Sequence, residues 1–303
     1  IGVFSKEMIN DNSEDMNLVL HRLQRVEKIM LLLNEQVSIL DTMTPLDFLE
    51  FRNLLTPASG FQSVQFRLIE ARLGLDMQRR HHADYYKRTN QGGFNSDDYN
   101  RINTIEGQPT LIRLINNWLE RMPFFELEYW TSYQPVSSAG DLHPFWNDYR
   151  SIYQSGLTEK EKPKYQDFLY TFFEITGEPA SDETYEYLRS LRSNLSHEAM
   201  RAALFIMLYR DFPYFQNSFR ILDTLINIDN SLAGWRHVHY RMVRRMIGMR
   251  VGTGNTSGAG YLEGAASKHY IFRDLASLST YLIERKKLPK LPTELVRKLS
   301  FME

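Results

Sequence analysis

Apolar residues recur at steps of three and four positions along almost the whole chain, and this spacing is the strongest constraint on its fold. Between Asn17 and Leu40 they stand at Leu18, Leu23, Val26, Ile29, Met30, Leu33, Val37 and Leu40. This spacing places them on one face of an α-helix. No segment alternates apolar and polar residues as a half-buried strand would. We therefore predict an all-α fold, a multi-helix bundle.

Local signals predict where several helices begin and end. In "TPLDFLEF", Thr44 can cap a helix, Pro45 suits its first position and Asp47 favours its positive N-terminus. A helix from about Phe61 is expected to stop at Gly74. Residues 75–108 are polar and are predicted to form a long loop within a single domain spanning residues 1–303. Further helices are predicted at 109–123, 143–156, 160–176, 182–193, 197–211, 215–227, 231–249 and 267–284.

The composition excludes several kinds of site and partner. The chain has no cysteine, which removes disulfides, thiolate nucleophiles and iron–sulfur clusters. Its 36 Lys and Arg residues balance 37 Asp and Glu residues, so no nucleic acid partner is expected. No apolar run approaches the roughly 18–20 residues of a membrane span, and no signal peptide is visible. We expect no membrane association and a cytoplasmic location.

Two histidines stand two positions apart in "WRHVHYRMVRRMIG" and would point about 200° apart on a helix. His237 shares its face with Arg241, Arg244 and Arg245, whereas His239 shares its face with Trp235, Met242, Met246 and Met249. Only His239 is therefore expected to face the interior. It is either a core histidine bonded to a backbone carbonyl or the single axial ligand of a flat apolar cofactor such as haem. The other paired histidines, in "RRHH" (Arg79–His82), lack a carboxylate at ligand spacing and are predicted to lie in a solvated loop.

A glycine-rich segment, "GTGNTSGAG" (Gly252–Gly260), follows this helix. It has neither the Lys-Ser/Thr pair of a Walker A loop nor the spacing of a dinucleotide-binding loop. Its backbone N–H groups, with the hydroxyls of Thr253, Thr256 and Ser257, could hold a small anion such as a carboxylate. A plain interhelical loop is the alternative.

One arginine, Arg52, shares a predicted helix face with Phe48, Phe51 and Leu55. Such an arginine can extend along the apolar face to reach water. Alternatively, its planar fork can pair with a substrate carboxylate at the rim of an apolar pocket.

Three segments together resemble the tryptophan 2,3-dioxygenase family: "LDTMTPLDFLEFRNLLTPASGFQSVQFRLIE" (Leu40–Glu70), "WRHVHYRMVRRMIG" followed by "GTG", and "HYIFRDLASLSTYLI". The resemblance extends in order over nearly the whole chain. It implies an all-α haem-binding bundle that assembles as a homotetramer and uses haem b, with Fe2+ in the active form, and O2 as co-substrate. The implied reaction inserts both oxygen atoms into the indole C2–C3 bond of L-tryptophan. The product is N-formylkynurenine, the first intermediate of tryptophan catabolism by the kynurenine route.

The resemblance also assigns roles to residues of this chain. His239 matches the proximal ligand of the haem iron, and Arg52 matches the arginine that pairs with the tryptophan carboxylate. Thr253, next to Gly252 in the glycine loop, matches a residue that contacts the substrate's ammonium and carboxylate groups. The other positions expected to line the substrate pocket are Phe48, Leu55, Ser59 and Gly60.

Two departures from the family pattern keep alternatives open. The family loop commonly reads Gly-Thr-Gly-Gly-Ser-Ser-Gly, so Asn255 and Thr256 could reshape the pocket. The family's distal helix, with its His-Gln pair, and the tyrosines lent by a neighbouring subunit have no match and would lie upstream of Ile1. No catalytic residue is therefore assigned in this chain. The alternatives are a related haem oxygenase acting on a substituted indole or a tyrosine-like amino acid, or a non-catalytic haem-binding helical protein.

Overall fold

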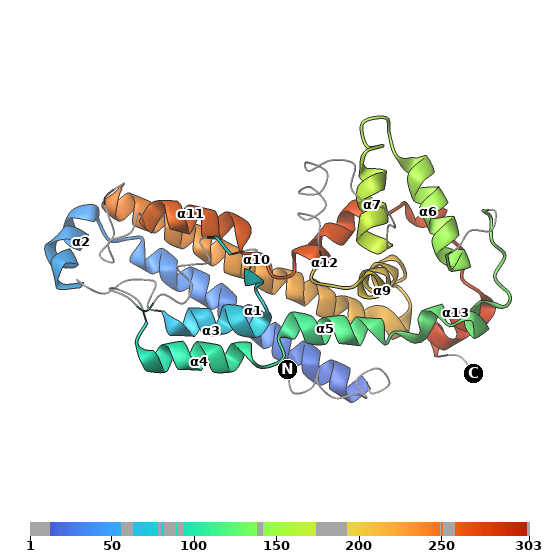
Figure 1. The fold of residues 1–303 in the computed structure, drawn as a ribbon, viewed down its shortest axis with the longest axis horizontal. Helices are drawn as coiled ribbons and strands as arrows, with labels where there is room; N and C mark the ends of the chain where they lie inside the picture. Colours follow the sequence, from blue (N-terminus) through green and yellow to red (C-terminus); the bar gives the residue numbers. More distant parts are fainter. Residues whose placement is uncertain are drawn as a thin grey trace. The chain divides into compact units, whose positions relative to one another are not determined.

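The computed structural model describes residues 13–55, 63–77, 80–81, 89, 94–137, 142–173, 193–248, 250 and 258–301. Within these ranges every regular element is a helix, as the spacing of apolar residues predicts (Figure 1). None of the described helices combines the length and apolar character needed to cross a bilayer. The α-helices are α1 (Ser13–Leu40), α2 (Pro45–Phe51), α3 (Val64–Leu73), α4 (Ser96–Glu106), α5 (Leu111–Glu120), α6 (Pro144–Gly156), α7 (Lys164–Phe172), α9 (His197–Leu208), α10 (Pro213–Ile247), α11 (Gly258–Lys268), α12 (Arg273–Ser277) and α13 (Thr293–Ser300). Short 3₁₀ helices are η1 (Arg52–Leu55), η5 (Pro123–Phe125), η6 (Leu127–Trp130), η7 (Leu278–Tyr281) and η8 (Arg285–Lys287).

The chain divides into two compact units, which we describe separately. Unit 1 comprises the described residues within His21–Leu114 and Thr224–Arg273, and unit 2 comprises those within Gly2–Leu20, Ile115–Asp223 and Asp274–Glu303. Most of α1, all of α2, α3, α4 and α11, and the second part of α10 belong to unit 1. That one domain spans the whole chain stays a prediction.

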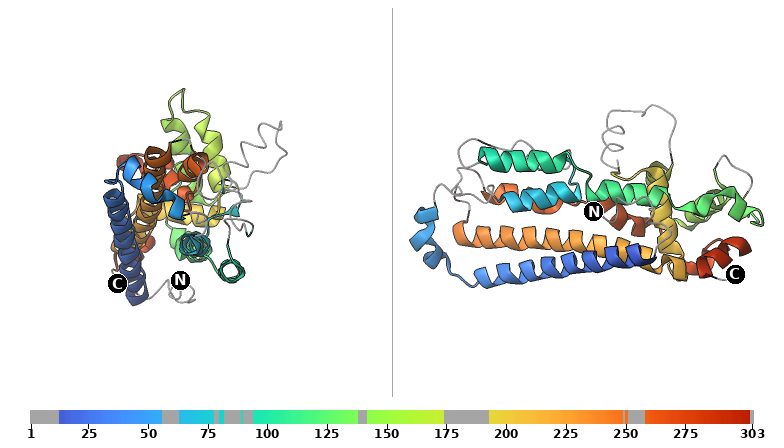
Figure 2. Two further views of the ribbon diagram at one scale, coloured as in Figure 1. Left: turned by 90° about the vertical axis from the view of Figure 1, so that its left-hand side faces the viewer. Right: turned by 90° about the horizontal axis from the view of Figure 1, so that it is seen from below.

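In unit 1, α1 and α10 lie side by side and run parallel (Figure 2). The Asn34 side-chain amide donates a hydrogen bond to the Ser231 carbonyl at 3.0 Å, and further along both helices Arg245 pairs with Asp41 at 3.2 Å. Asp41 lies in the turn between α1 and α2. The C-terminal end of α10 therefore lies beside the chain that enters α2 (Figures 1 and 2).

The polar segment 75–108 was predicted as a loop, and the structure corrects this by placing α4 within it. Asn95 caps α4 by accepting a hydrogen bond from the Asp98 N–H at 2.8 Å, and Asp97 and Asp98 favour the first turn. The helix buries fully only Ile102, which packs in a cluster with Val64 of α3. A helix with one buried apolar residue shows no apolar period, so its sequence could not be distinguished from a loop.

Two further predictions, a helix break near residue 229 and a continuous helix over 267–284, were wrong. Both errors trace to the hydrogen bonds of the Asp229 carboxylate. The sequence predicted a break between helices at 215–227 and 231–249, but α10 continues through that point. Asp229 is buried and accepts hydrogen bonds from the backbone N–H groups of Ile271 (2.9 Å) and Phe272 (2.8 Å). Those N–H groups are thereby satisfied outside any helix. The helix predicted over 267–284 is accordingly interrupted between α11 and α12.

In unit 2, α5, α6, α7 and α9 surround a core built mainly of aromatic rings. Trp118 of α5, Phe145 of α6, Phe168 of α7 and Phe205 of α9 are all fully buried. The hydroxyl of Tyr149, also within this core, donates to the Tyr281 carbonyl at 2.7 Å. These helices agree with the predicted segments within a few residues, whereas α13 was not predicted. Nearly all of the helix expected at 182–193 lies outside the described residues.

Candidate functional site

The two histidines of α10 differ in burial as the helical geometry predicts. His237 is exposed together with Arg241, Arg244 and Arg245, whereas His239 is partly buried. On the His239 face, Met246 is buried and Trp235 and Met242 are partly buried, while Met249 lies outside the described residues. His239 therefore faces the packed side of α10.

Aromatic rings fix the surroundings of His239. The Trp235 ring, one turn earlier on α10, lies 5.0 Å from the His239 ring between centroids. The Phe66 ring of α3 stacks on the Trp235 ring, with 4.9 Å between the two ring centroids. His239 thus stands at the end of a row of three rings that links α3 to α10.

The chemistry of His239 fits an axial ligand. Burial lowers the pKa of His239, which favours the neutral imidazole that binds a metal. Its Nδ1 is buried and finds no hydrogen-bond partner among the described residues. A core histidine bonded to a backbone carbonyl would show a partner for this nitrogen, and the described residues supply none. The donor set, one neutral imidazole in apolar aromatic surroundings, therefore suits a haem-type cofactor better than a polar core contact.

The other described candidates lie on and after α2. A capping box fixes the start of α2: the Thr44 side chain accepts from the Asp47 N–H, and the Asp47 carboxylate accepts from the Thr44 N–H at 3.2 Å. Arg52 follows at the end of this helix, with its backbone N–H bonded to the Phe48 carbonyl. Arg52 and Phe48 are partly buried, and Leu55 is exposed. The remaining predicted pocket positions, Ser59, Gly60, Gly252 and Thr253, lie outside the described residues.

The end of the glycine-rich segment differs from the sequence prediction. Gly258–Gly260 were expected to belong to a loop, but α11 begins at Gly258. Residues in a first helical turn need no intrahelical partner for their N–H groups, which makes three small residues there tolerable.

A buried charge cluster in unit 1 was missed by reasoning from sequence. Glu70 of α3 is fully buried, and both oxygens of its carboxylate are engaged. Arg67 and Arg80 approach Oε2 at 3.1 and 2.7 Å, and Arg236 approaches Oε1 at 3.0 Å. His269 Nδ1 lies 3.4 Å from Oε1, longer than an ordinary hydrogen bond. Arg80, expected in a solvated loop, is therefore buried in an ion pair instead.

The Glu70 carboxyl group is kept ionised by the residues around it. Burial by itself would raise the pKa of Glu70, but the His269 contact and the three guanidinium groups hold that pKa well below its ordinary value. A buried carboxylate is stable only when paired in this way. The available sequence signal was the i, i+3 pair of Arg67 and Glu70; nothing local marked Arg80 or Arg236 as partners.

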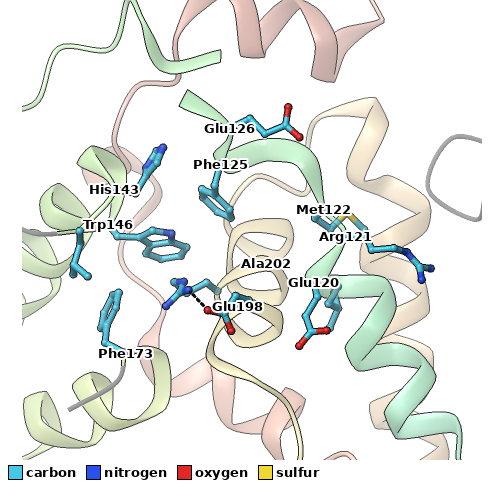
Figure 3. A pocket seen from close by; sticks show the side chains of 13 residues that line it. Glu120, Arg121, Met122, Phe125, Glu126, His143, Trp146, Phe173, Glu198 and Ala202 are labelled. Carbon is cyan, nitrogen blue, oxygen red and sulfur yellow. Dashed lines mark hydrogen bonds and ion pairs between the residues drawn. The ribbon is translucent and has the colours of Figure 1, made fainter. Parts of the chain in front are cut away.

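A separate pocket of about 690 Å³ lies in unit 2 (Figure 3). The rings of Phe125 and Trp146 lie 5.4 Å apart in its wall, and Arg201 pairs with Glu198 at 3.0 Å. Burial lowers the pKa of His143, another lining residue, to about 4. Phe48, Arg52, Leu55 and His239 do not line this pocket. Its lining residues are Leu119, Glu120, Arg121, Met122, Phe125, Glu126, Leu142, His143, Trp146, Phe173, Glu198, Arg201 and Ala202.

Comparison with known proteins relates nearly the whole chain to one family. The family model described as tryptophan 2,3-dioxygenase matches residues 2–282. The tryptophan 2,3-dioxygenase of Alteromonas mediterranea is 35% identical over 303 residues, covering 99% of this chain and 82% of that protein. The one from Bdellovibrio bacteriovorus is 37% identical, covering 99% and 83%. The one from Dictyostelium discoideum is 38% identical, covering 94% and 71%.

Proposed function

Because this chain belongs to the tryptophan 2,3-dioxygenase family, we propose that it inserts both atoms of O2 into the indole C2–C3 bond of L-tryptophan. One bond of the indole ring is cleaved, both oxygen atoms are retained, and the product is N-formylkynurenine. The observation that carries the proposal is the place of His239: a partly buried imidazole on the apolar face of α10, with its Nδ1 unpartnered among the described residues.

His239 would hold the iron of haem b, in the Fe2+ form, as its single protein ligand. Haem supplies the chemistry of O2 activation when it is bound. The chain's own contribution is a neutral imidazole, kept so by burial, and the apolar side chains beside it on α10, Trp235, Met242 and Met246. These side chains would limit the access of water to His239.

Arg52 would orient the amino-acid end of the substrate. Its planar guanidinium can donate two parallel hydrogen bonds to a carboxylate, which fixes both distance and orientation. Phe48 lies one turn earlier on α2 and would offer an apolar wall to the indole ring, with Leu55 beyond it. Positioning of this kind lowers the barrier by removing the entropy of alignment in advance. Ser59, Gly60, Gly252 and Thr253 complete the proposed pocket on the strength of the family resemblance.

The enzyme is proposed to be a homotetramer in which a neighbouring subunit contributes to each site. An apolar stripe on α1, made of Ile29, Leu32, Ile39 and Leu40, supports this assembly because all four side chains are exposed in the single chain. Exposed apolar residues that share one helix face commonly mark a contact surface between proteins.

The purified protein, reduced under nitrogen and mixed first with L-tryptophan and then with 18O2, tests the proposed reaction. We expect the absorbance of a histidine-ligated haem, followed by formation of N-formylkynurenine carrying two labelled oxygen atoms by mass spectrometry. A hydroxylated product with one labelled oxygen would instead indicate a related oxygenase, and no product with any indole would overturn the assignment.

Two matched variants test the ligand. His239→Ala should lose bound haem, whereas His237→Ala, two positions away on the exposed face, should keep it. Retention of full haem by His239→Ala would refute the role of His239.

A further inference from the structure

The buried cluster around Glu70 is connected to the row of rings that ends at His239. Glu70 and Phe66 lie one turn apart on α3, and Trp235 and Arg236 are neighbours on α10. The two helices are therefore joined twice at the same level. One link is the ion pair between Glu70 and Arg236, and the other is the stack of Phe66 on Trp235.

Arg236 couples these two links. It donates through Nη2 to Glu70 Oε1 at 3.0 Å and through Nη1 to the His269 carbonyl at 2.8 Å. Its guanidinium carbon also lies 5.4 Å from the centre of the Phe66 ring. With both ends of the fork bonded, the guanidinium plane has a fixed direction, and it lies over the Phe66 ring in a cation–π contact.

The stacked rings bear on the orientation of His239 because its buried Nδ1 has no hydrogen-bond partner among the described residues. Ligand histidines commonly donate their second nitrogen to a carboxylate or a carbonyl, which sets the direction of the ring. The Nδ1 of His239 makes no such bond to any described residue. The Trp235 ring lies 5.0 Å from the His239 ring between centroids, and the Phe66 ring stacks on Trp235 in turn.

We propose that Glu70 is a positioning residue for His239, acting through Arg236 and the Phe66–Trp235 stack. The inference rests on the proposed function, in which His239 binds haem iron. Glu70 touches neither the imidazole nor any reacting atom. It fixes the guanidinium of Arg236, which fixes the rings, and these limit the rotation of the His239 side chain.

The test makes the same substitution, arginine to lysine, at two partners of the Glu70 carboxylate and compares the results. Arg236→Lys keeps a positive charge for Glu70 but cannot bond Glu70 and the His269 carbonyl together while lying across Phe66. Arg67→Lys makes the same change at another buried partner of Glu70, which bonds the other carboxylate oxygen at 3.1 Å and the Tyr261 hydroxyl at 3.3 Å. Haem dissociation and the iron–histidine stretching band, measured by resonance Raman on the reduced holoenzyme, report the setting of the imidazole.

For Arg236→Lys we expect a shifted or broadened iron–histidine band and haem loss about tenfold faster, the lower end of what losing an outer partner of a metal ligand costs. Arg67→Lys should match the wild type in both measurements. Equal behaviour of the two variants, with or without a change, would overturn the proposal, because the cluster would then act only on stability. If Arg236→Lys does not fold by circular dichroism, Phe66→Leu replaces it, since every charge is kept and only the intervening ring is removed. A wild-type protein that binds no haem would refute the proposed function instead.

Discussion

Arg52 has two possible roles: its side chain extends to water, or it binds the carboxylate of the substrate. It is partly buried at the end of α2, one turn after Phe48. An arginine that only extends to water can be replaced by lysine at little cost, because both carry the same charge. An arginine that donates two hydrogen bonds to one carboxylate cannot be replaced in this way, because the ammonium group of lysine does not reproduce the planar guanidinium.

We therefore predict that Arg52→Lys lowers kcat/KM for L-tryptophan by about 10- to 100-fold, because losing one charge-assisted hydrogen bond costs about 1.5–3 kcal/mol. Steady-state kinetics of N-formylkynurenine formation measure this loss. Arg25→Lys, at an exposed position of α1, is the control and should leave the rate unchanged. Wild-type kinetics in Arg52→Lys would remove Arg52 from the substrate site.

His143 is a residue whose charge should govern part of the acid stability. Burial lowers its pKa from the ordinary 6.5 to about 4, so between these values the unfolded chain binds a proton that the folded ring does not. The free energy of unfolding should fall as pH drops through this window, by at most about 1.4 kcal/mol per pH unit from this group. His143→Asn should remove that part of the slope, because asparagine does not titrate and can still accept from the Phe145 N–H, as His143 does now at 3.3 Å.

Urea unfolding at a series of pH values measures the His143 effect. The control His21→Asn, at an exposed position, should keep the wild-type slope. An unchanged slope in His143→Asn would show that this ring does not supply the acid sensitivity.

At the level of helices, most boundaries could be predicted because capping is local. The Thr44–Asp47 capping box and the left-handed Gly74 at the end of α3 both lie where the sequence placed them. The uninterrupted α10 was not predicted, because nothing near Asp229 in the sequence shows where its carboxylate finds partners. Its carboxylate is instead bonded 42 and 43 residues away, at Ile271 and Phe272.

Gly74 has two roles: it adopts a left-handed backbone conformation, and it allows close packing against Ile112. Alanine substitutions at three glycines separate these roles. At φ +100°, an added Cβ would lie 2.5 Å from the Ile112 side chain, so Gly74→Ala combines backbone strain with a clash. Gly248 has φ +58° with nothing within 4 Å of such a Cβ, and Gly156 has open space and no positive φ. We expect a loss of about 1–2 kcal/mol for Gly248→Ala from strain alone and a further 1–3 kcal/mol or so for Gly74→Ala from overpacking.

Chemical denaturation of the three variants checks this order. Gly156→Ala should be neutral or more stable by about 0.4–1 kcal/mol, since alanine restricts the unfolded chain. Equal stabilities of Gly74→Ala and Gly248→Ala would mean that α3 can move away from Ile112 at no cost.

At the level of the whole molecule, the described candidates for haem and substrate binding lie in unit 1, whereas the 690 Å³ pocket lies in unit 2. The exposed stripe on α1, in which Leu32 is 52% exposed, supports the proposed assembly. A side chain of this size is stabilised by moving from water into a subunit contact.

We predict that Leu32→Glu dissociates the proposed tetramer, because a carboxylate buried in an apolar contact is costly. Sedimentation velocity measures the change in mass. Leu31→Glu, about 100° from Leu32 around the same helix and 42% exposed, should leave the assembly intact. A tetramer that survives Leu32→Glu would place the subunit contact elsewhere.

The sequence by itself determined the all-α class, the ends of α2 and α3, and which of the two histidines of α10 faces the interior. Each of these depends on residues within about four positions of one another, where helical spacing and capping act. Only the tertiary structure decided that Glu70 gathers Arg67, Arg80 and Arg236, and that Phe66 stacks on Trp235. Glu70 and Arg236 are 166 residues apart in the chain. A buried charge is stable only with partners, and the partners available to it are set by which helices pack together.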